Sequence, residues 1–531
     1  MQISLSAMLY TVSIAIYLFA LVGVGVYKTK MVKNSEDFMV AGRILPWYIL
    51  VGTLLATWMG SGSLFSGAGL GYRNGPAALW SSGGAWLGIT LIYFIAKRIR
   101  NFGKVTVPDI FEIRYGRTAA VLATITTVVA YLTIVSYQFR GGGKVLSMVS
   151  DGYISLEAGI IITAVFAISY TVLAGMFSVV YTDVVNGVLM TIGVLAALGF
   201  MTYNVGGVGE IITVADQAGK WSLFGNWASE RVGDISGPII AISFFVPTML
   251  LLMGDANMYQ RIFSAKDGGS AKKAVFFWII GVIILESSIS FLGLTGSVAA
   301  DKGLMPDLVA ESQLLVIESA SEVGKLPAEA DMLSARQSGS ESVIPAIAKY
   351  GGLPIIIGLI LVSTMMAIIV STADSFLLIP ATNLTRDVYQ RYININASEK
   401  QIIFISRILV LILGVIAYLL VSQFKTVLNA AFTAYNIYGA SLTPALLAAF
   451  LWKRATKEGA VASIITGATV TIVWTYFLPS WGGFSNLHPF LQELTYPAAG
   501  LSVIILIVVS LLTPAPSKAV YEQFFNDSES I

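Results

Sequence analysis

The chain has 531 residues, of which 56% are apolar and only 12% are charged, about half the charged share of a soluble globular domain. Its 32 lysines and arginines against 30 aspartates and glutamates give a net charge of +2, so it lacks the basic face that a nucleic-acid binder needs. It has no cysteine and one histidine, which excludes a disulfide framework, thiolate metal sites and a multi-histidine zinc site. The class that remains is a polytopic membrane protein.

Thirteen stretches are apolar over the roughly 20 residues that a helix needs to cross the hydrocarbon core. These runs are continuous rather than alternating, which predicts helices and not a β-barrel. We therefore expect an all-α protein in which residues 1–531 form a single transmembrane domain. The predicted spans are 7–27, 46–71, 77–97, 119–147, 157–177, 178–202, 238–262, 274–298, 352–384, 403–423, 427–451, 459–479 and 496–513.

Lysine and arginine are concentrated on one side of these spans. With the N-terminus outside, the inner segments hold 22 of them and the outer loops hold 7, so the positive-inside rule predicts the N-terminus out and the C-terminus in. The first span is followed by Lys28, Lys30 and Lys33, which predicts a retained helix rather than a signal peptide. We expect a multi-pass plasma-membrane protein (inner membrane in a Gram-negative bacterium) with a cytoplasmic tail at 514–531 and no obligate protein partner.

Two of the predicted outer loops, 203–237 and 299–351, are longer than connectors. Each carries scattered apolar residues, which favours short helices lying on the outer face. A solvated loop without structure is the alternative.

Three classes of function fit many spans: a transporter, a channel and an intramembrane enzyme. The only histidine, His488, falls in an outer loop, so a buried Ser–His pair is unavailable. Residues 141–144 read Gly-Gly-Gly-Lys but lack the following Ser or Thr of a phosphate-binding loop, which argues against a nucleotide-driven pump. We therefore expect a secondary transporter driven by an ion gradient and not an enzyme, with an ion channel or sensor as the alternative.

Two predicted spans contain helix-breaking residues in corresponding places, which is typical of a transporter binding site. The second span contains Gly and Ser in alternation at 58–63, which should unwind the helix and free backbone carbonyls. The span at 238–262 contains Pro247, which is expected to break it near its middle. Residues 46–202 and 238–451 would then form two five-helix repeats, inverted relative to each other because five is odd. An extra helix at 7–27 precedes them, and additional helices at 459–513 follow.

A polar run, Ser371-Thr372-Ala373-Asp374-Ser375, interrupts the long span 352–384. Helical spacing puts its hydroxyls and its carboxylate near one face. Together with the loosened carbonyls near Ala56 and Met59, these oxygens could strip and hold a small hard cation, and a single carboxylate favours Na⁺ over Mg²⁺ or Ca²⁺. The alternative is that the hydroxyls bond to their own helix while Asp374 caps or pairs near the inner face.

Three further ionisable groups lie within predicted spans, where each is a candidate site residue. Arg140 lies deep in its span, and Glu286 lies in the middle of another. They could form an ion pair, or Arg140 could receive a carboxylate of the substrate through its planar fork. Asp255 is a candidate gate, or a partner for Arg261.

Four stretches of this chain together resemble the sodium/solute symporter family. They are Ser35–Arg43, Ala174–Asp183, Tyr259–Lys266 and Ser371–Ser375. The resemblance extends over about 8–478 and implies a leucine-transporter-like fold with two inverted five-helix repeats. It also implies sodium-driven uptake of a small solute by alternating access.

The resemblance also implies where sodium binds. Its conserved-type site falls on the carbonyls of Ala56, Met59 and Ile368 and on the hydroxyls of Ser371 and Thr372. Some members have a further sodium site, which matches Asp183, Ser371, Asp374 and Ser375 in this chain. Here Asp374 replaces the hydroxyl that those members use.

The resemblance leaves the solute open among several classes. Sugar-transporting relatives carry amides and carboxylates where this chain has mostly apolar or small residues, and relatives that take sialic acid use an arginine in a place comparable to Arg140. We therefore expect a carboxylate-bearing solute such as an amino acid or an organic or sialic-type acid, with a sugar or vitamin as the alternative. The candidate substrate residues are Trp58, Ser61, Ser63, Arg140, Phe244, Phe245, Thr248 and Tyr435.

Overall fold

The computed structural model describes residues 4–28, 34–103, 106–225, 227, 236–322, 326–478, 481 and 483–525. Within these ranges the chain consists of helices joined by short loops, with no strand, so the predicted all-α class is confirmed. The end of the predicted tail, 526–531, lies outside the described residues.

The helices of the first half are α1 (Leu5–Lys28), α2 (Ser35–Val40), α3 (Trp47–Trp58), α4 (Ala68–Asn74), α5 (Leu79–Asn101), α6 (Val107–Tyr115), α7 (Arg117–Val149), α8 (Leu156–Asn204), α9 (Val208–Gln217), α10 (Gly237–Gly254) and α11 (Ala256–Phe263). Those of the second half are α12 (Gly268–Asp301), α13 (Leu308–Glu322), α14 (Glu329–Glu341), α15 (Val343–Tyr350), α16 (Ile355–Asn383), α17 (Glu399–Leu420), α18 (Val427–Leu451), α19 (Lys457–Ile472), α20 (Pro489–Gln492), α21 (Thr495–Leu512) and α22 (Lys518–Phe525).

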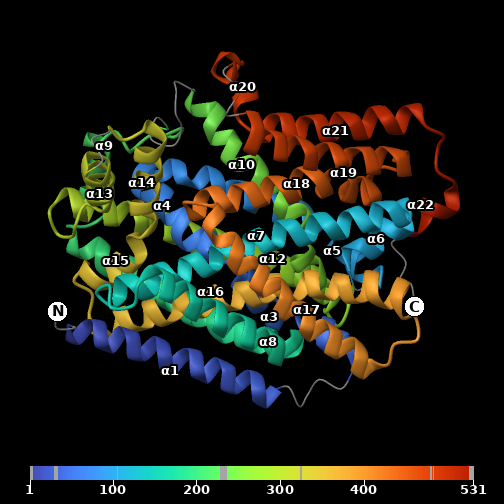
Figure 1. Cartoon of the computed structure of the whole chain (residues 1–531), viewed down its shortest axis with the longest axis horizontal. Helices are drawn as coiled ribbons and strands as arrows, with labels where there is room; N and C mark the ends of the chain where they lie inside the picture. Colours follow the sequence, from blue (N-terminus) through green and yellow to red (C-terminus); the bar gives the residue numbers. More distant parts are fainter. Residues whose placement is uncertain are drawn as a thin grey trace.

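Long helices run side by side through the molecule, with α1 along one edge and the packed pair α19 and α21 along the other (Figure 1). In the described part of the chain, twelve stretches are long and apolar enough to cross a bilayer, and α3 adds a shorter apolar helix. The first and last helices begin and end at opposite ends of the long axis (Figure 1). The number of crossings and the predicted orientation in the membrane stay predictions.

The predicted break in the second span is present. Helix α3 ends at Trp58, and Met59 adopts an extended conformation with φ −71° and ψ 123°. The chain resumes as a π-helical turn at Gly62–Gly67, which leads into α4. The alternation of Gly and Ser therefore does loosen this span where the sequence predicts it.

The second broken helix does not break at Pro247, and that prediction is wrong. Helix α10 continues through Pro247 to Gly254. A proline removes the N–H that would bond to the carbonyl four residues earlier. Here that carbonyl belongs to Ser243, and it accepts a hydrogen bond from Thr495 Oγ1 at 3.2 Å. Because a neighbouring helix satisfies the freed group, the proline is tolerated.

The break lies instead between α10 and α11, at Asp255, where φ is −57° and ψ is 113°. Tyr438 of α18 bridges it: its hydroxyl donates to the Gly254 carbonyl at 2.8 Å and accepts from the Ala256 N–H at 3.1 Å. The Asp255 carboxylate caps α11 by accepting from the Asn257 N–H at 2.8 Å. Partners on another helix thus replace the hydrogen bonds that the break removes.

The two spans predicted at 157–177 and 178–202 are present as two apolar helical stretches, Leu156–Leu173 and Val179–Asn204, which together make up α8. Its kink is at Gly175, where φ is 60° and ψ is 176°. A residue with a Cβ rarely adopts this backbone conformation, so glycine permits the turn between the two spans.

The two long predicted outer loops contain the short helices α9 in one case and α13, α14 and α15 in the other. All four cluster at the end of the molecule where α1 begins (Figure 1). The broken helices α3 and α10 open the stretches 46–202 and 238–451, and these repeat boundaries stay a prediction.

Helices α4 and α12 pack with their backbones almost touching. A Cβ added at Gly293 of α12 would lie 2.0 Å from the Ala68 carbonyl oxygen, and one at Gly71 of α4 would lie 2.1 Å from that of Ser290. This contact fixes α12 against the resumed half of the broken helix. It thereby sets the position of Glu286, which lies one turn from Ser290.

We expect Gly293→Ala to lower the melting temperature of the purified protein, because overpacking at a backbone contact costs about 1–3 kcal/mol. The matched control is Gly199→Ala in α8, where an added Cβ meets nothing within 4 Å. Thermal unfolding in detergent measures both variants. Equal melting temperatures for Gly293→Ala and the wild type would show that this contact carries no constraint.

Candidate functional site

Helix α16 brings its polar run to the break in α3. Thr372 Oγ1 donates to the Met59 carbonyl oxygen at 2.6 Å and lies 3.4 Å from that of Ala56. Both carbonyls are free of intrahelical donors because α3 ends here. Ile368, one turn before Thr372 on α16, is fully buried. Oxygens from two helices that are far apart in the sequence thus meet at one point.

Helix α7 supports the loosened segment from the other side. The Gln138 amide oxygen accepts a hydrogen bond from the Ser61 N–H at 2.8 Å. A Cβ at Gly60 would lie 2.8 Å from the Gln138 amide nitrogen and 3.0 Å from Thr372 Cγ2. Glycine is therefore needed at position 60, because the unwound backbone is held tightly between α7 and α16.

The residues predicted for a further sodium site surround a guanidinium. Arg261 Nη2 lies 3.3 Å from the Asp183 carboxylate and 2.7 Å from Ser375 Oγ. The carboxylate also accepts from Thr53 Oγ1 at 2.6 Å and from the hydroxyl of Ser371. Ser371 therefore faces Asp183 and not the Met59 carbonyl. The structure brings this set together around a cationic side chain of the protein itself.

The proposed pairing of Asp255 with Arg261 is wrong. Asp255 accepts from the Tyr131 hydroxyl and caps α11, while Arg261 forms its ion pair with Asp183. A carboxylate at the start of a helix accepts hydrogen bonds from the free N–H groups of that helix. Asp255 is used in this way, and Arg261 pairs with Asp183 instead.

Asp374 is fully buried beside this cluster. Its carboxylate oxygens accept no hydrogen bond of standard geometry, and the Thr171 hydroxyl lies beside them. Arg261 carries one positive charge, whereas Asp183 and Asp374 can carry two negative charges. A buried carboxylate without a cationic partner is costly in a membrane protein. The cluster is therefore suited to take up one more cation.

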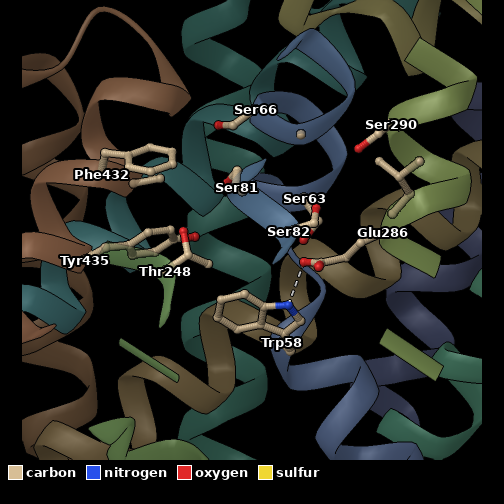
Figure 2. A pocket seen from close by; sticks show the side chains of 14 residues that line it. Trp58, Ser63, Ser66, Ser81, Ser82, Thr248, Glu286, Ser290, Phe432 and Tyr435 are labelled. Carbon is tan, nitrogen blue, oxygen red and sulfur yellow. Dashed lines mark hydrogen bonds between the residues drawn. The ribbon is translucent and has the colours of Figure 1, made fainter. Parts of the chain in front are cut away.

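A pocket lies on the other side of the α3 break, between α3, the π-helical turn, α5, α10, α12 and α18. Figure 2 shows it with Trp58 below, the rings of Phe432 and Tyr435 to one side and Glu286 facing them. The lining residues are Trp58, Gly62, Ser63, Ser66, Gly67, Ser81, Ser82, Thr248, Glu286, Ile289, Ser290, Ala431, Phe432 and Tyr435. The cavity measures about 30 Å³, enough for a few waters, so a larger solute requires the side chains to move apart.

Glu286 is held in this pocket by indole groups. Trp58 Nε1 donates to one of its carboxylate oxygens at 2.8 Å (Figure 2), and Trp86 Nε1 donates to the other at 3.0 Å. The Ser82 hydroxyl lies beside the same carboxylate. All three donors are neutral, so they orient the carboxylate without cancelling its charge.

The ion pair between Arg140 and Glu286 that the sequence allows is not formed. Arg140 Nη2 donates to the Val421 carbonyl at 3.0 Å, and Arg140 does not line the pocket. On a helix the side chain at 140 points away from that at 138, and here Gln138 faces the α3 break. The position of Arg140 deep in its span therefore does not show which neighbouring helix its side chain faces.

The predicted substrate residues divide into two groups. Four of them line the pocket: Trp58, Ser63, Thr248 and Tyr435. Ser61 instead faces Gly141 of α7, because a Cβ added at Gly141 would lie 2.1 Å from Ser61 Oγ. Phe244 packs between Trp227 and Phe432, and Phe245 packs against Trp80. These three therefore support the walls and do not line the cavity.

Sequence reasoning missed several residues of the site. Gln138, Ser66 and Phe432 carry no signal of their own, because an amide, a hydroxyl and a phenyl ring are common within spans. For Glu286, the sequence indicates a mid-span carboxylate and leaves an ion pair with Arg140 as one alternative, and that pair is not formed. A search for a mid-span carboxylate opposite the unwound segment would have found it.

Comparison with protein families agrees with this arrangement. The model of the sodium:solute symporter family matches residues 38–467. The chain is 25% identical to the osmoregulated proline transporter of Bacillus subtilis (strain 168), over 97% of this chain and 96% of the relative. It is also 25% identical to the sodium/proline symporter of Escherichia coli (strain K12), over 97% of this chain and 95% of that relative.

Solved structures with the same architecture include a Na⁺-coupled sialic acid symporter in a substrate-bound outward-open state. It has a TM-score of 0.74 and 19% identity, covering 96% of this chain and 98% of that one. A nucleobase-cation-symport-1 family transporter, closed with bromovinylhydantoin bound, gives a TM-score of 0.55 at 13% identity, over 92% and 97% of the two chains. At these identities the likeness establishes the fold, which is leucine-transporter-like.

Proposed function

This chain belongs to the sodium:solute symporter family, and on that premise we propose that it takes up a small carboxylate-bearing solute of amino-acid size by alternating access. It is a multi-pass plasma-membrane protein that couples transport to sodium. Support for the solute class comes from the bacterial relatives, whose names describe proline transporters. The pocket lining contains no amide side chain, which argues against the sugar alternative.

We propose that sodium binds between the end of α3 and the polar run of α16. Its ligands are the carbonyls of Ala56, Met59 and Ile368 and the hydroxyls of Thr372 and Ser371, of which Ser371 would turn from Asp183 toward the ion. The observation that carries this proposal is the contact of Thr372 Oγ1 with the Met59 carbonyl at 2.6 Å. Carbonyl and hydroxyl dipoles of this kind replace the hydration shell of a small monovalent cation. Sodium is therefore a transported ion here and not a resident cofactor.

The pocket next to the break is the proposed solute site. From the predicted set it uses Trp58, Ser63, Thr248 and Tyr435. The π-helical turn restarts at Gly62, and the first N–H groups of a helix favour an anion. Ser66 Oγ is buried there without a hydrogen-bond partner. These groups support binding of the solute carboxylate at the start of the turn.

Coupling follows from the segment that both sites share. Residues 58–63 supply a carbonyl to the ion on one side and Trp58 and Ser63 to the pocket on the other. An ion that holds this segment against α16 also fixes the pocket wall. Sodium can shift the conformational equilibrium only through its different affinities for the two states, so its ligands must separate when the transporter opens inward.

We propose a second sodium ion at Asp183, Asp374 and Ser375. The buried carboxylate of Asp374, which accepts no hydrogen bond of standard geometry, supports it, because Arg261 neutralises only one of the two aspartates. The Ser375 hydroxyl, which accepts a hydrogen bond from Arg261, would turn toward the ion. Two ions would provide a steeper dependence of transport on sodium than one.

We expect Thr372→Ala to raise the sodium concentration for half-maximal uptake at least tenfold, which corresponds to about 1.4 kcal/mol. The variant removes the hydroxyl that reaches both α3 carbonyls. The matched control is Thr364→Ala, two turns earlier on α16, whose hydroxyl bonds only to the Ile360 carbonyl of its own helix. Sodium titration of solute uptake in proteoliposomes measures both. An unchanged half-maximal concentration in Thr372→Ala would reject the first sodium site.

For the second ion, we expect uptake by the wild type to depend on sodium with a Hill coefficient above 1. Asp374→Ala should reduce the coefficient to about 1, since the carboxylate that balances the extra charge is gone. Asp374→Glu retains the carboxylate and should keep the cooperativity. A hyperbolic sodium dependence of the wild type would exclude the second ion and leave the first site intact.

A further inference from the structure

Glu286 is the one charged side chain in the pocket lining. It is 5% exposed and belongs to α12, which the Gly293 and Gly71 contacts lock against α4. Its two oxygens each accept one indole N–H, and the Ser82 hydroxyl lies beside them. An ionised carboxylate has room for about four hydrogen bonds, so acceptor capacity remains for a ligand.

Among the described residues, no lysine or arginine lines the cavity to balance this charge. Two basic residues of α7 are engaged elsewhere: Arg140 donates to the Val421 carbonyl, and Lys144 pairs with Glu341 at 2.6 Å. Arg73 of α4, the helix packed against α12, donates to the Ser340 hydroxyl. A buried carboxylate with neutral neighbours is costly unless a cation joins it. A cationic group on the ligand would supply the missing positive charge.

The rest of the lining suits a cationic nitrogen. The rings of Trp58 and Tyr435 lie 6.4 Å apart with an interplanar angle of 31°, and Phe432 lies 5.5 Å from Tyr435. All three rings line the cavity that Glu286 faces (Figure 2). Aromatic faces attract ammonium groups through their quadrupoles, most strongly when the site is desolvated. The Glu286 carboxylate and the aromatic rings therefore both favour a positively charged nitrogen.

We propose that Glu286 is the counter-ion for a positively charged nitrogen of the solute, so that the transported solute is a zwitterion: an amino acid or a betaine rather than an organic or sialic-type acid. This inference rests on the proposed function, which assigns the solute carboxylate to the start of the π-helical turn. The two ends of the solute then meet opposite partners, the ammonium at Glu286 and the carboxylate at Gly62, Ser63 and Ser66. A solute with only a carboxylate would bring a second negative charge beside Glu286.

Matched pairs of probes test this on the wild-type protein. Each pair shares a shape and a carboxylate, and only one member carries a positive nitrogen: L-proline with cyclopentanecarboxylate, glycine betaine with 3,3-dimethylbutanoate, and L-alanine with 2-methylpropanoate. Purified protein in sodium chloride is titrated with each probe, and the thermal shift is recorded. We expect at least one nitrogen-bearing member to bind, and to bind at least tenfold more tightly than its partner. N-acetylneuraminate, an anion of larger size, should give no shift.

Variants of Glu286 locate the effect. Glu286→Gln keeps the shape and one acceptor for the indoles but removes the charge, and should weaken binding of the nitrogen-bearing probe at least tenfold. Glu286→Asp keeps the charge and should retain more of the affinity than Glu286→Gln. Pyrrolidine has the nitrogen of proline without the carboxylate, so it should bind the wild type more weakly than L-proline does. That binding should also be lost in Glu286→Gln.

Three results would overturn the proposal: equal affinity for both members of each pair, a response to none of the six matched probes, or unchanged affinity in Glu286→Gln. The stabilisation by sodium chloride over potassium chloride, measured without solute and lost in Thr372→Ala, reports on the proposed sodium coupling separately. If sodium stabilises the protein but the nitrogen-bearing probes bind no more tightly than their partners, the solute is not a zwitterion. The proposal of sodium-coupled symport is then unaffected. If the stabilisation by sodium is absent, the proposed function itself fails.

Discussion

Backbone that leaves its helix inside a bilayer must find hydrogen-bond partners elsewhere, because the hydrocarbon offers none. The segment after Trp58 meets this requirement with side chains from two other helices. Gln138 of α7 accepts the N–H of Ser61, and Thr372 of α16 donates to the carbonyl of Met59. The arrangement of α3, α7 and α16 therefore depends on this segment. Both candidate sites are built directly on it.

The second broken helix follows the same rule with different partners. Tyr438 satisfies the carbonyl of Gly254 and the N–H of Ala256 with a single hydroxyl. Tyr131 and Tyr438 stack at 5.4 Å, and the Tyr131 hydroxyl bonds to Asp255. Polar aromatic residues are suited to this role, because they bring a hydrogen-bonding tip on an apolar body. Both breaks thus lie where close packing is combined with satisfied polar groups.

Which of these features could be predicted depends on whether the signal is local. The break at 58–63 was predictable, since Gly and Ser in alternation weaken a helix by themselves. The break at Asp255 was not, because Pro247 gives the stronger local signal and only the distant Thr495 shows why it is harmless. The kink at Gly175 could only be inferred from the length of the apolar run.

The site divides in the same way. Helical spacing places Thr372 and Asp374 correctly on one helix, but the partner of each is set by packing between helices. Arg261 joins Asp183 from 78 residues away in the sequence. For Glu286, the sequence indicates a carboxylate in the middle of a span but not which side chains contact it. Depth alone suggested Arg140 as its partner, whereas the structure surrounds it with two tryptophans and a cavity.

If sodium joins the unwound end of α3 to α16, amide hydrogen exchange of both segments responds to the ion. Peptides covering 55–62 and 366–376 are compared in sodium chloride and in potassium chloride at equal ionic strength, without solute. We expect slower exchange in sodium for both peptides together, while a peptide from α21, remote from the site, stays unchanged. Identical exchange in the two salts for both site peptides would contradict it.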